Sequence, residues 1–460
     1  MTPRHRSTAL DGFRLVCGSS LLIASGWLGS LPAAAQPAPR GSDLQVNTYT
    51  WSFQQLSSIG VDTFGNFVVA WASTGSDGSD SSAESIHARR FAADGTALGP
   101  GFQVNTYTTG SQDHPALSVS PFGSFVVVWE SYGSSGTDDS FKSIQARAFD
   151  AFGLPIRDQF QVNLYTDGIQ YGTSVSSSGN GDFVVTWVSE GSDASDDDGT
   201  AIQARRFDLR GEPLGGEFQV NSYTTGNQLY PAVDFGPEGS FIVAWESWGS
   251  AGGDTDRGSI QARRFDASGE PVGSEFQVNT WTTLRQTRPD VAVDASGRFV
   301  VAWDGYGSTG SDQSALSVHL RRYDAGGVAA GDEVQVNQYS TGHQLGASVD
   351  ATADGSVVVA WWSYGSSGTD TSYSSIQARN CHVASDCPGN EFQVNVGTES
   401  FQFRPAVAAV PAGEFVVTWT SWISEGDDDS LSSVQVRRYD ALLSDGFESG
   451  DTSRWSSTSS

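Results

Sequence analysis

The residues best suited to chemistry in this sequence are basic, acidic and phenolic side chains at equivalent places in different copies of a repeat. They are Asp113, His114, Tyr171, Tyr230, Arg288 and Arg404. The imidazole and the two guanidinium groups could together hold an anion. Because these positions differ between copies, they could form one site in an otherwise symmetric molecule. Loop tips that vary without function would leave the same residues there.

A second candidate site is a loop position that is aromatic in five copies. The residues are Tyr132, Trp248, Tyr306, Tyr364 and Trp422. Exposed rings beside hydroxyl groups and carboxylates suit stacking against sugars. The alternative is that each ring packs over its own loop as a lid.

One loop position is aspartate in every copy, which raises the possibility of bound calcium. Candidate ligands are Asp80, Asp138, Asp196, Asp254 and Asp428. They stand on Gly- and Ser-rich segments that offer hard oxygen ligands. No loop has the EF-hand pattern, and Asp312 and Asp370 lack a second acid nearby, so solvated acidic loops explain the same residues. No other cofactor is expected.

Two cysteines, Cys381 and Cys387, occupy a stretch that other copies fill with a short turn. The ends of such a turn lie close together, which favours a local disulfide in an oxidising compartment. His382 between them suggests a metal site, but two thiols and one imidazole lack a fourth ligand.

These residues are carried by a repeat of 58 residues. The triplet Gln-Val-Asn begins at Gln45, Gln103, Gln161, Gln219, Gln277, Gln335 and Gln393. Turn residues divide each copy into four expected strands. In the fourth copy these are Phe218–Tyr223, Pro231–Phe235, Phe241–Glu246 and Ser259–Asp266. Gly239 and its six equivalents precede the second strand, where a tight turn requires a positive φ.

The fold class that follows is all-β, a seven-bladed β-propeller of four-stranded repeats over residues 44–440. The second strand is apolar on both faces, as a strand covered on both sides must be. The N-terminal Gln-Val-Asn strand should complete the last blade and close the ring. A linear β-solenoid is the alternative. Polar residues that recur in every copy, such as Arg89 and its equivalents, are expected to be structural, with a carboxylate or backbone partner.

The chain ends suggest export. Residues 1–35 resemble a secretory signal peptide, 36–43 a linker and 441–460 a tail. The net charge of −28 disfavours nucleic acid and anionic membranes. We therefore expect a secreted monomer, extracellular or periplasmic, without a membrane span. The tail segment DGFESGDTSRWS resembles short tails of secreted bacterial proteins. The repeats resemble exported bacterial β-propellers of unassigned function.

These features favour a binding or scaffold propeller for polysaccharide or a surface protein. The alternative is a carbohydrate-active enzyme with a site at the axial mouth. The arginines there resemble those of sialidases, but the Asp-box pattern is absent, as is a clear pair of carboxylates for glycosidase chemistry. No Ser/His/Asp, Cys/His or HExxH arrangement is present either. We therefore name no catalytic residue and expect no enzyme activity.

Overall fold

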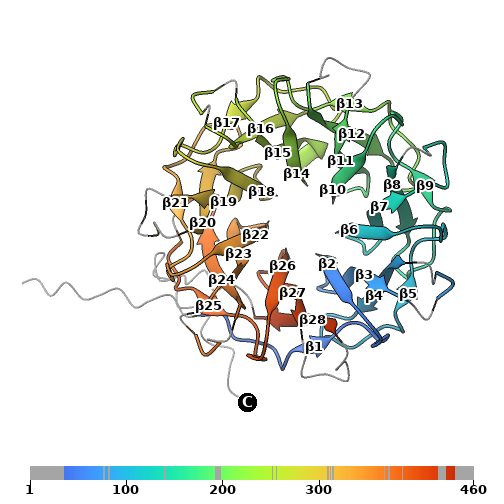
Figure 1. Ribbon diagram of the computed structural model, residues 1–460. Helices are drawn as coiled ribbons and strands as arrows, with labels where there is room; N and C mark the ends of the chain where they lie inside the picture. Colours follow the sequence, from blue (N-terminus) through green and yellow to red (C-terminus); the bar gives the residue numbers. More distant parts are fainter. Residues whose placement is uncertain are drawn as a thin grey trace, which may run out of the picture. The chain divides into compact units, whose positions relative to one another are not determined.

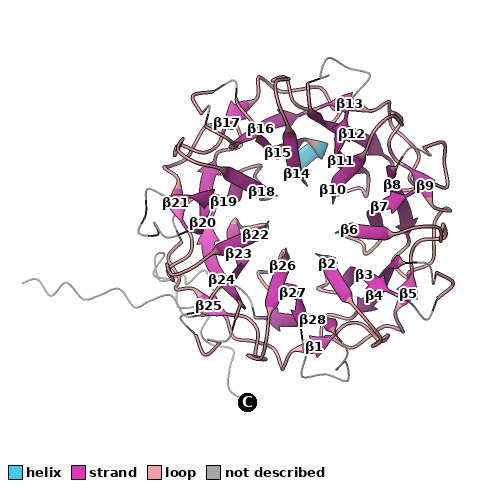
Figure 2. Cartoon of the chain, viewed as in Figure 1, coloured by secondary structure: helices cyan, strands magenta, loops and turns pink. Residues whose placement is uncertain are grey.

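The protein is described by a computed structural model over residues 36–440, apart from 76–77, 81–82, 139–140, 192–197, 251, 255, 308–309, 311, 313–314, 367, 371–372, 386 and 423–430. This part of the chain forms seven antiparallel sheets of four strands, arranged as the blades of a propeller (Figure 1). The predicted fold class is confirmed. The helical content of the described residues is a single 3₁₀ turn, η1 (Pro237–Gly239), visible in Figure 2. Among the described residues no helix is long and apolar enough to cross a membrane.

Each blade runs from an inner to an outer strand. The inner strands are β2 (Gln54–Val61), β6 (Gln112–Val119), β10 (Gln170–Ser177), β14 (Gln228–Phe235), β18 (Gln286–Val293), β22 (Gln344–Ala351) and β26 (Gln402–Ala409). The second strands are β3 (Phe67–Thr74), β7 (Phe125–Tyr132), β11 (Phe183–Glu190), β15 (Phe241–Ser247), β19 (Phe299–Tyr306), β23 (Ser356–Ser363) and β27 (Phe415–Trp422). The third strands are β4 (Glu84–Phe91), β8 (Lys142–Phe149), β12 (Thr200–Phe207), β16 (Ser259–Phe265), β20 (Leu316–Tyr323), β24 (Ser375–His382) and β28 (Ser432–Tyr439). The outer strands are β1 (Leu44–Gln45), β5 (Phe102–Gln103), β9 (Phe160–Gln161), β13 (Phe218–Gln219), β17 (Phe276–Gln277), β21 (Val334–Gln335) and β25 (Phe392–Gln393).

The ring closes as the repeat pattern predicts. β1 pairs with β28, so the first Gln-Val-Asn strand is the outer strand of the seventh blade (Figure 1). β2 also contacts β26, which joins the inner strands of the first and last blades. The stretch expected as a linker extends this pairing, because the Asp440 amide donates to the Ala38 carbonyl at 2.8 Å. Closure therefore leaves neither the first nor the last repeat with an unpaired edge.

The second strand is buried on both faces, as its apolar sequence requires. In β7, Val127 and Trp129 pack against the first blade, and Val126 and Val128 pack against the third. The Trp129 indole donates to Gln112 Oε1 at 3.1 Å, which satisfies its buried N–H. The first, fourth, fifth and seventh blades repeat this contact, so the tryptophan and the glutamine form one structural unit in five blades.

Recurring arginines bind neighbouring blades through backbone carbonyls. Arg205 on β12 donates to the Val162 carbonyl of the second blade at 2.8 Å. Its neighbour Arg206 points the other way and donates to the Ala267 carbonyl of the fourth blade. The partner of the first arginine is a backbone carbonyl in all seven blades, although Arg437 also lies 3.7 Å from Asp43. Of the two partners that the sequence left open, the backbone is the common one.

Strand boundaries differ from the predicted ones at both edges of a blade. β14 begins at Gln228 rather than Pro231, because a bulge carries the strand three residues further back. The outer strand is only two residues long, because the Asn side chain continues the pairing in place of the backbone. Asn279 Oδ1, for example, accepts the Ile260 amide at 2.8 Å.

Two local predictions are confirmed. Gly239 and its six equivalents all have positive φ, between 79° and 101°. Cys381 and Cys387 form a disulfide across the turn that follows β24.

Candidate functional site

The start of every inner strand carries a β-bulge whose second residue has a positive φ. Five of these residues are not glycine: Leu56, His114, Tyr230, Arg288 and Arg404. Gly172 and Gly346 fill the position in the third and sixth blades. Bulges re-aim side chains, and this one turns residues of different blades toward the axis. Leu56, His114, Gly172 and Arg404, from four blades, line one pocket of about 230 Å³. We call this region the axial mouth.

The second blade contributes a charged cluster to the mouth. His114 Nδ1 lies 3.2 Å from Asp113 Oδ1, and Lys142 Nζ lies 2.6 Å from Glu130 Oε2 and 3.5 Å from Asp113 Oδ1. Burial alone would lower the pKa of His114, but its bond to Asp113 and the charge of Glu130 raise that pKa. Burial opposes ionisation of Asp113, yet His114 and Lys142 together lower its pKa. Both shifts favour the charged form of the group concerned.

Asp113, His114 and Glu130 also have the spacing of metal ligands. Each of them offers one ligand atom, and these three atoms lie within 4.8 Å of one another. The Lys142 ammonium already lies between the two carboxylates. A divalent cation there would be repelled by Lys142 unless that side chain moved.

Arg404 is a cation of the mouth with an exposed side chain. Among the described residues no carboxylate lies within ion-pair distance of it. Partial desolvation by neighbouring atoms, and then the charge of Arg288, lower its pKa, although the charge of Glu84 opposes this shift. Arg288 lies 3.6 Å from Asp304 and 5.8 Å from the centre of the Tyr230 ring. The structure thus brings His114, Arg288, Arg404 and Tyr230 to one opening, while burial raises the pKa of the half-buried Tyr171 to about 12.

Sequence reasoning missed three buried carboxylates on second strands. Glu130, Glu246 and Asp304 are each at most 3% exposed. Glu130 and Asp304 accept the amides of Gly172 and Gly346 in the next blade, at 2.7 and 2.8 Å. Glu246 instead binds Arg285 at 2.8 and 3.1 Å. An acidic residue in a strand otherwise apolar on both faces was the signal that could have found them.

The five predicted loop aromatics are all exposed, from 37% for Tyr306 to 46% for Tyr132. They divide into two groups. Lys142 lies over the Tyr132 ring at 4.7 Å, and the Trp248 indole donates to Glu246 at 2.8 Å. The other three join a chain of ring contacts across blades five to seven.

We call that chain the aromatic band. Successive ring centres lie 4.7–6.5 Å apart along Tyr306, His343, Tyr364, Trp362, Phe403, Trp422, Phe401 and Tyr373. Phe403, a member of the band, is the residue before Arg404 in the sequence. The sequence predicted five separate exposed rings at one loop position. In the structure three of them, Tyr306, Tyr364 and Trp422, are connected by rings from other positions, such as His343 and Phe403.

The acidic loop residues are part of the blade framework. Asp138 Oδ2 accepts the Asn163 side-chain amide at 2.7 Å, and the Asp138 backbone amide donates to Gln161 at 3.0 Å. Asp80, Asp254, Asp312 and Asp370 make the same two contacts in their blades. One oxygen of each is therefore committed to an amide. Asp196 and Asp428 lie outside the described residues.

Three further carboxylates face the axial channel below the mouth. Asp234, Asp290 and Asp350 accept amides of the next inner strand, at 2.7–2.8 Å. They are partly exposed to the channel but enclosed by the ring of inner strands. Burial raises their pKa values to about 7, 6 and 7. Ser58 takes the same role in the first blade, and Ser348 does so in the sixth blade beside Asp350.

Comparison with known proteins supports the propeller and goes no further. No family model and no curated protein matches the sequence. The structure is similar to a protein of unknown function from Dyadobacter fermentans, with 9% identity, a TM-score of 0.50, and coverage of 87% of this chain and 98% of that one. An α-L-arabinofuranosidase from Fusarium graminearum has 12% identity and a TM-score of 0.47, covering 86% and 97%. An α-L-arabinanase from Penicillium chrysogenum has 13% identity and a TM-score of 0.46, covering 87% and 98%. At these identities the likeness concerns the fold alone.

Proposed function

We propose that this propeller is an exported binding module for a polysaccharide, held along the aromatic band with an acidic substituent at the axial mouth. The observation that carries the proposal is the band itself, which includes Phe403, the residue before Arg404. Rings in a row offer successive stacking surfaces, as a chain of sugars requires. A surface-protein partner would not need a row of rings that leads to a single cation.

The mouth favours an anionic group on the ligand. A carboxylate or sulfate at Arg404 would pair with a guanidinium that no carboxylate of the described residues binds. Arg288 and His114 lie close enough to contribute. The net charge of −28 opposes a densely charged polymer. We therefore propose a largely neutral polysaccharide with isolated acidic groups.

The proposal is tested on an array of neutral, uronate-containing and sulfated polysaccharides, followed by calorimetric titration of those that bind. Trp422→Ala should weaken binding at least tenfold, because it interrupts the band. Tyr132→Ala removes an equally exposed ring outside the band and should bind like the wild type. Equal losses in both variants, or no binding on the array, would exclude the band as the site.

The charge requirement has its own matched pair of variants. Arg404→Gln should abolish the preference for acidic polysaccharides while leaving neutral ones bound. Arg210→Gln removes the same charge from a turn on the opposite face and should change neither. Salt should weaken binding of acidic polysaccharides in the wild type and leave Arg404→Gln unaffected. Retained preference in Arg404→Gln would refute the role of the mouth.

A carbohydrate-active enzyme is the second candidate, because the pocket of the mouth holds Glu130 and His114 together. Glycoside hydrolysis needs one protonated carboxyl group as the general acid. Glu130 Oε2 already binds Lys142 Nζ at 2.6 Å, and His114 and Lys142 lower the pKa of Asp113. We therefore expect no release of reducing ends from any bound polysaccharide. Release that Glu130→Gln abolishes, at unchanged affinity, would establish the enzyme instead.

A further inference from the structure

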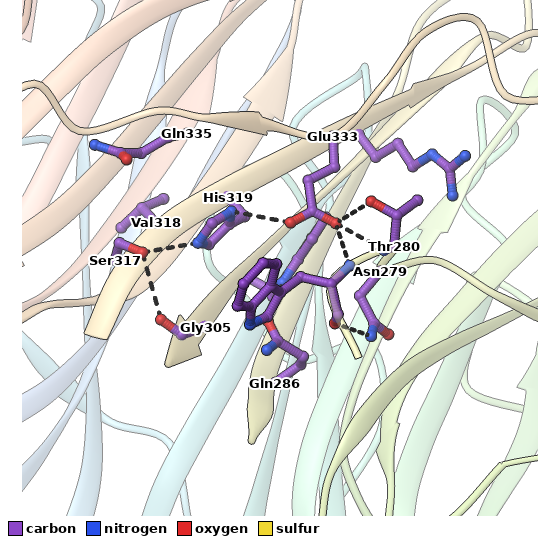
Figure 3. A network of polar contacts seen from close by, with 12 residues as sticks. Asn279, Thr280, Gln286, Gly305, Ser317, Val318, His319, Glu333 and Gln335 are labelled. Atoms are coloured by element: carbon purple, nitrogen blue, oxygen red, sulfur yellow. Dashed lines mark hydrogen bonds and ion pairs between the residues drawn. The ribbon is translucent and has the colours of Figure 1, made fainter. Parts of the chain in front are cut away.

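Buried polar groups between the blades find their partners within the fold. In the fifth blade, Glu333 Oε2 accepts the Thr280 amide at 2.7 Å, and Glu333 Oε1 lies 3.4 Å from His319 Nδ1 (Figure 3). The other ring nitrogen, His319 Nε2, lies 2.7 Å from Ser317 Oγ. This network is buried and offers nothing to an outside partner. Three exposed apolar side chains on the face of the tight turns differ from it in both respects.

A phenylalanine stands at the tip of three turns in the first two blades. Phe64 and Phe122 lie between the first and second strands of their blades, and Phe152 lies between the third and fourth strands of the second blade. They are 73%, 73% and 76% exposed. Because successive strands of a blade are antiparallel, all three turns lie on one face, opposite the loop aromatics.

The three turns also contact one another. The Thr63 amide donates to the Pro121 carbonyl at 3.2 Å, which joins the turn of the first blade to that of the second. A Cβ at Gly123 would lie 3.3 Å from Asp62 Oδ2 and 3.2 Å from Ala151 Cβ, so the turn of Phe122 lies between the other two. The three rings therefore project from one continuous surface, which we call the phenylalanine patch.

The blade does not need aromatic rings at these positions. The residues equivalent to Phe64 and Phe122 in the other blades are Asn180, Glu238, Ser296, Asp354 and Ala412. Those equivalent to Phe152 include Asp94, Arg210, Ser268 and Gly326. Rings that the fold does not require and that water solvates poorly mark a surface for interaction when they are contiguous.

The patch is too small for a stable interface with a second protein. An aromatic side chain offers about 150–250 Å² of contact area, so the three rings together expose roughly 300–550 Å². A stable protein interface buries about 800 Å² on each partner. The rings also stand on separate turns. A rigid partner would have to fill the gaps between them, whereas fluid lipid does so without a matching surface.

The backbone of these turns suits the surface of a bilayer. Asp62 Oδ1 accepts the Phe64 amide at 2.8 Å, and Asp150 Oδ1 accepts the Phe152 amide at 2.9 Å. The Phe152 carbonyl in turn accepts Arg90. These polar groups are bonded without water, as a backbone segment that enters lipid requires.

The charge of the patch indicates the kind of lipid. Residues 62–66, 120–124 and 150–155 contain two carboxylates and no lysine or arginine. Because the chain has a net charge of −28, anionic headgroups would repel it. A zwitterionic headgroup carries no net charge and avoids this repulsion.

We propose that the phenylalanine patch docks this propeller on the surface of a zwitterionic phospholipid bilayer, with Phe64, Phe122 and Phe152 inserted among the lipids. The axial mouth and the aromatic band would then face away from the membrane. The docking surface is on the other face from the proposed polysaccharide site and is independent of it.

Co-sedimentation of the full mature chain with phosphatidylcholine vesicles tests the proposal. The triple variant Phe64→Ser, Phe122→Ser, Phe152→Ser should partition at least a hundredfold more weakly, because it loses all three apolar anchors. Its melting temperature and its polysaccharide binding should not change, since Ser296 and Ser268 occupy equivalent turns in other blades. Phe122→Ser alone should weaken partitioning at least fivefold, which keeps the test available if the triple variant unfolds.

Trp51→Ser is the matched control, because Trp51 is 75% exposed in a loop on the opposite face, between β1 and β2. It should partition like the wild type, and addition of phosphatidylglycerol to the vesicles should weaken partitioning of both. Absence of binding by the wild type, or equal binding by the triple variant, would overturn the proposal.

Two other occupants of the patch would give distinct results. A wild type that sediments as a dimer, beside a monomeric triple variant, would make the patch an interface between two copies. Vesicle binding that appears only when residues 441–460 are removed would show that the tail covers the patch. Either result would refute docking of the full chain on a bilayer.

Discussion

The channel carboxylates predict that this protein is more stable in mild acid than at neutral pH. Burial first, and then the charge of Asp234, raise the pKa of Asp350 to about 7. The folded state therefore binds more protons than the unfolded state between about pH 4 and pH 7. Stability from this group is present below that window and is lost as the pH rises through it.

The substitution Asp350→Asn isolates the effect, because the amide oxygen can still accept the Ala409 amide, now 2.7 Å away. One proton over the roughly three pH units between the unfolded and the folded pKa, at about 1.4 kcal/mol each, corresponds to about 4 kcal/mol at pH 7.5 and to roughly 1–2 kcal/mol at pH 5. The stability advantage of Asp350→Asn over the wild type should therefore grow by about 2–3 kcal/mol between pH 5 and pH 7.5.

Urea unfolding followed by tryptophan fluorescence at both pH values measures this difference. The exposed Asp158→Asn is the control and should stay within about 0.5 kcal/mol of the wild type at both. A gap between Asp350→Asn and the wild type that is the same at pH 5 and pH 7.5 would refute the reasoning. It would mean that channel water solvates the carboxylate as well in the folded as in the unfolded state.

Four other perturbations have defined outcomes. Arg205→Ala removes a charged hydrogen bond between two blades and should lower the free energy of unfolding by about 2 kcal/mol in urea titrations; no change would assign blade cohesion to apolar packing alone. Asn163→Ala leaves the buried Asp138 without its amide donor and should cost about 3 kcal/mol by the same measurement, whereas a loss below about 1 kcal/mol would show that water replaces the amide. Because Asp138 Oδ2 is already bound to Asn163, a calcium chelator should leave the melting temperature of the protein unchanged. A fall in the melting temperature would establish a calcium site. Reduction of the Cys381–Cys387 disulfide closes no large loop and should cost at most about 2 kcal/mol in thermal melts; a larger loss would show that the bond also holds the turn against its neighbours.

The fold could be predicted from the sequence because the same strand and turn patterns recur in seven copies. A strand apolar on both faces, a glycine before it and a tryptophan at its end each recur at one spacing, so chance patterns cancel. The structure confirms the blades, the ring closure, the positive φ at Gly239 and its equivalents, and the disulfide. The bulge was not readable, because it depends on pairing between strands and not on the residue types at Leu56, Tyr230 or Arg404.

For the candidate sites, the sequence predicted which residue types were present but not which side chains contact one another. The sequence identified His114, Arg288 and Arg404 as places where the copies disagree, and neighbouring blades bring them to one mouth. It could not distinguish Tyr132, which lies under a lysine, from Trp422, which joins other rings, because their neighbours come from different repeats.

The sequence by itself determined the number of blades, their strands and their closure, because each rests on periodicity and local turn chemistry. Tertiary structure alone decided which charges are paired. Glu130 binds Lys142, whereas Arg404 lies within ion-pair distance of no carboxylate of the described residues. The physical reason is that pairing and burial depend on distances across blades, which no spacing along a single repeat contains.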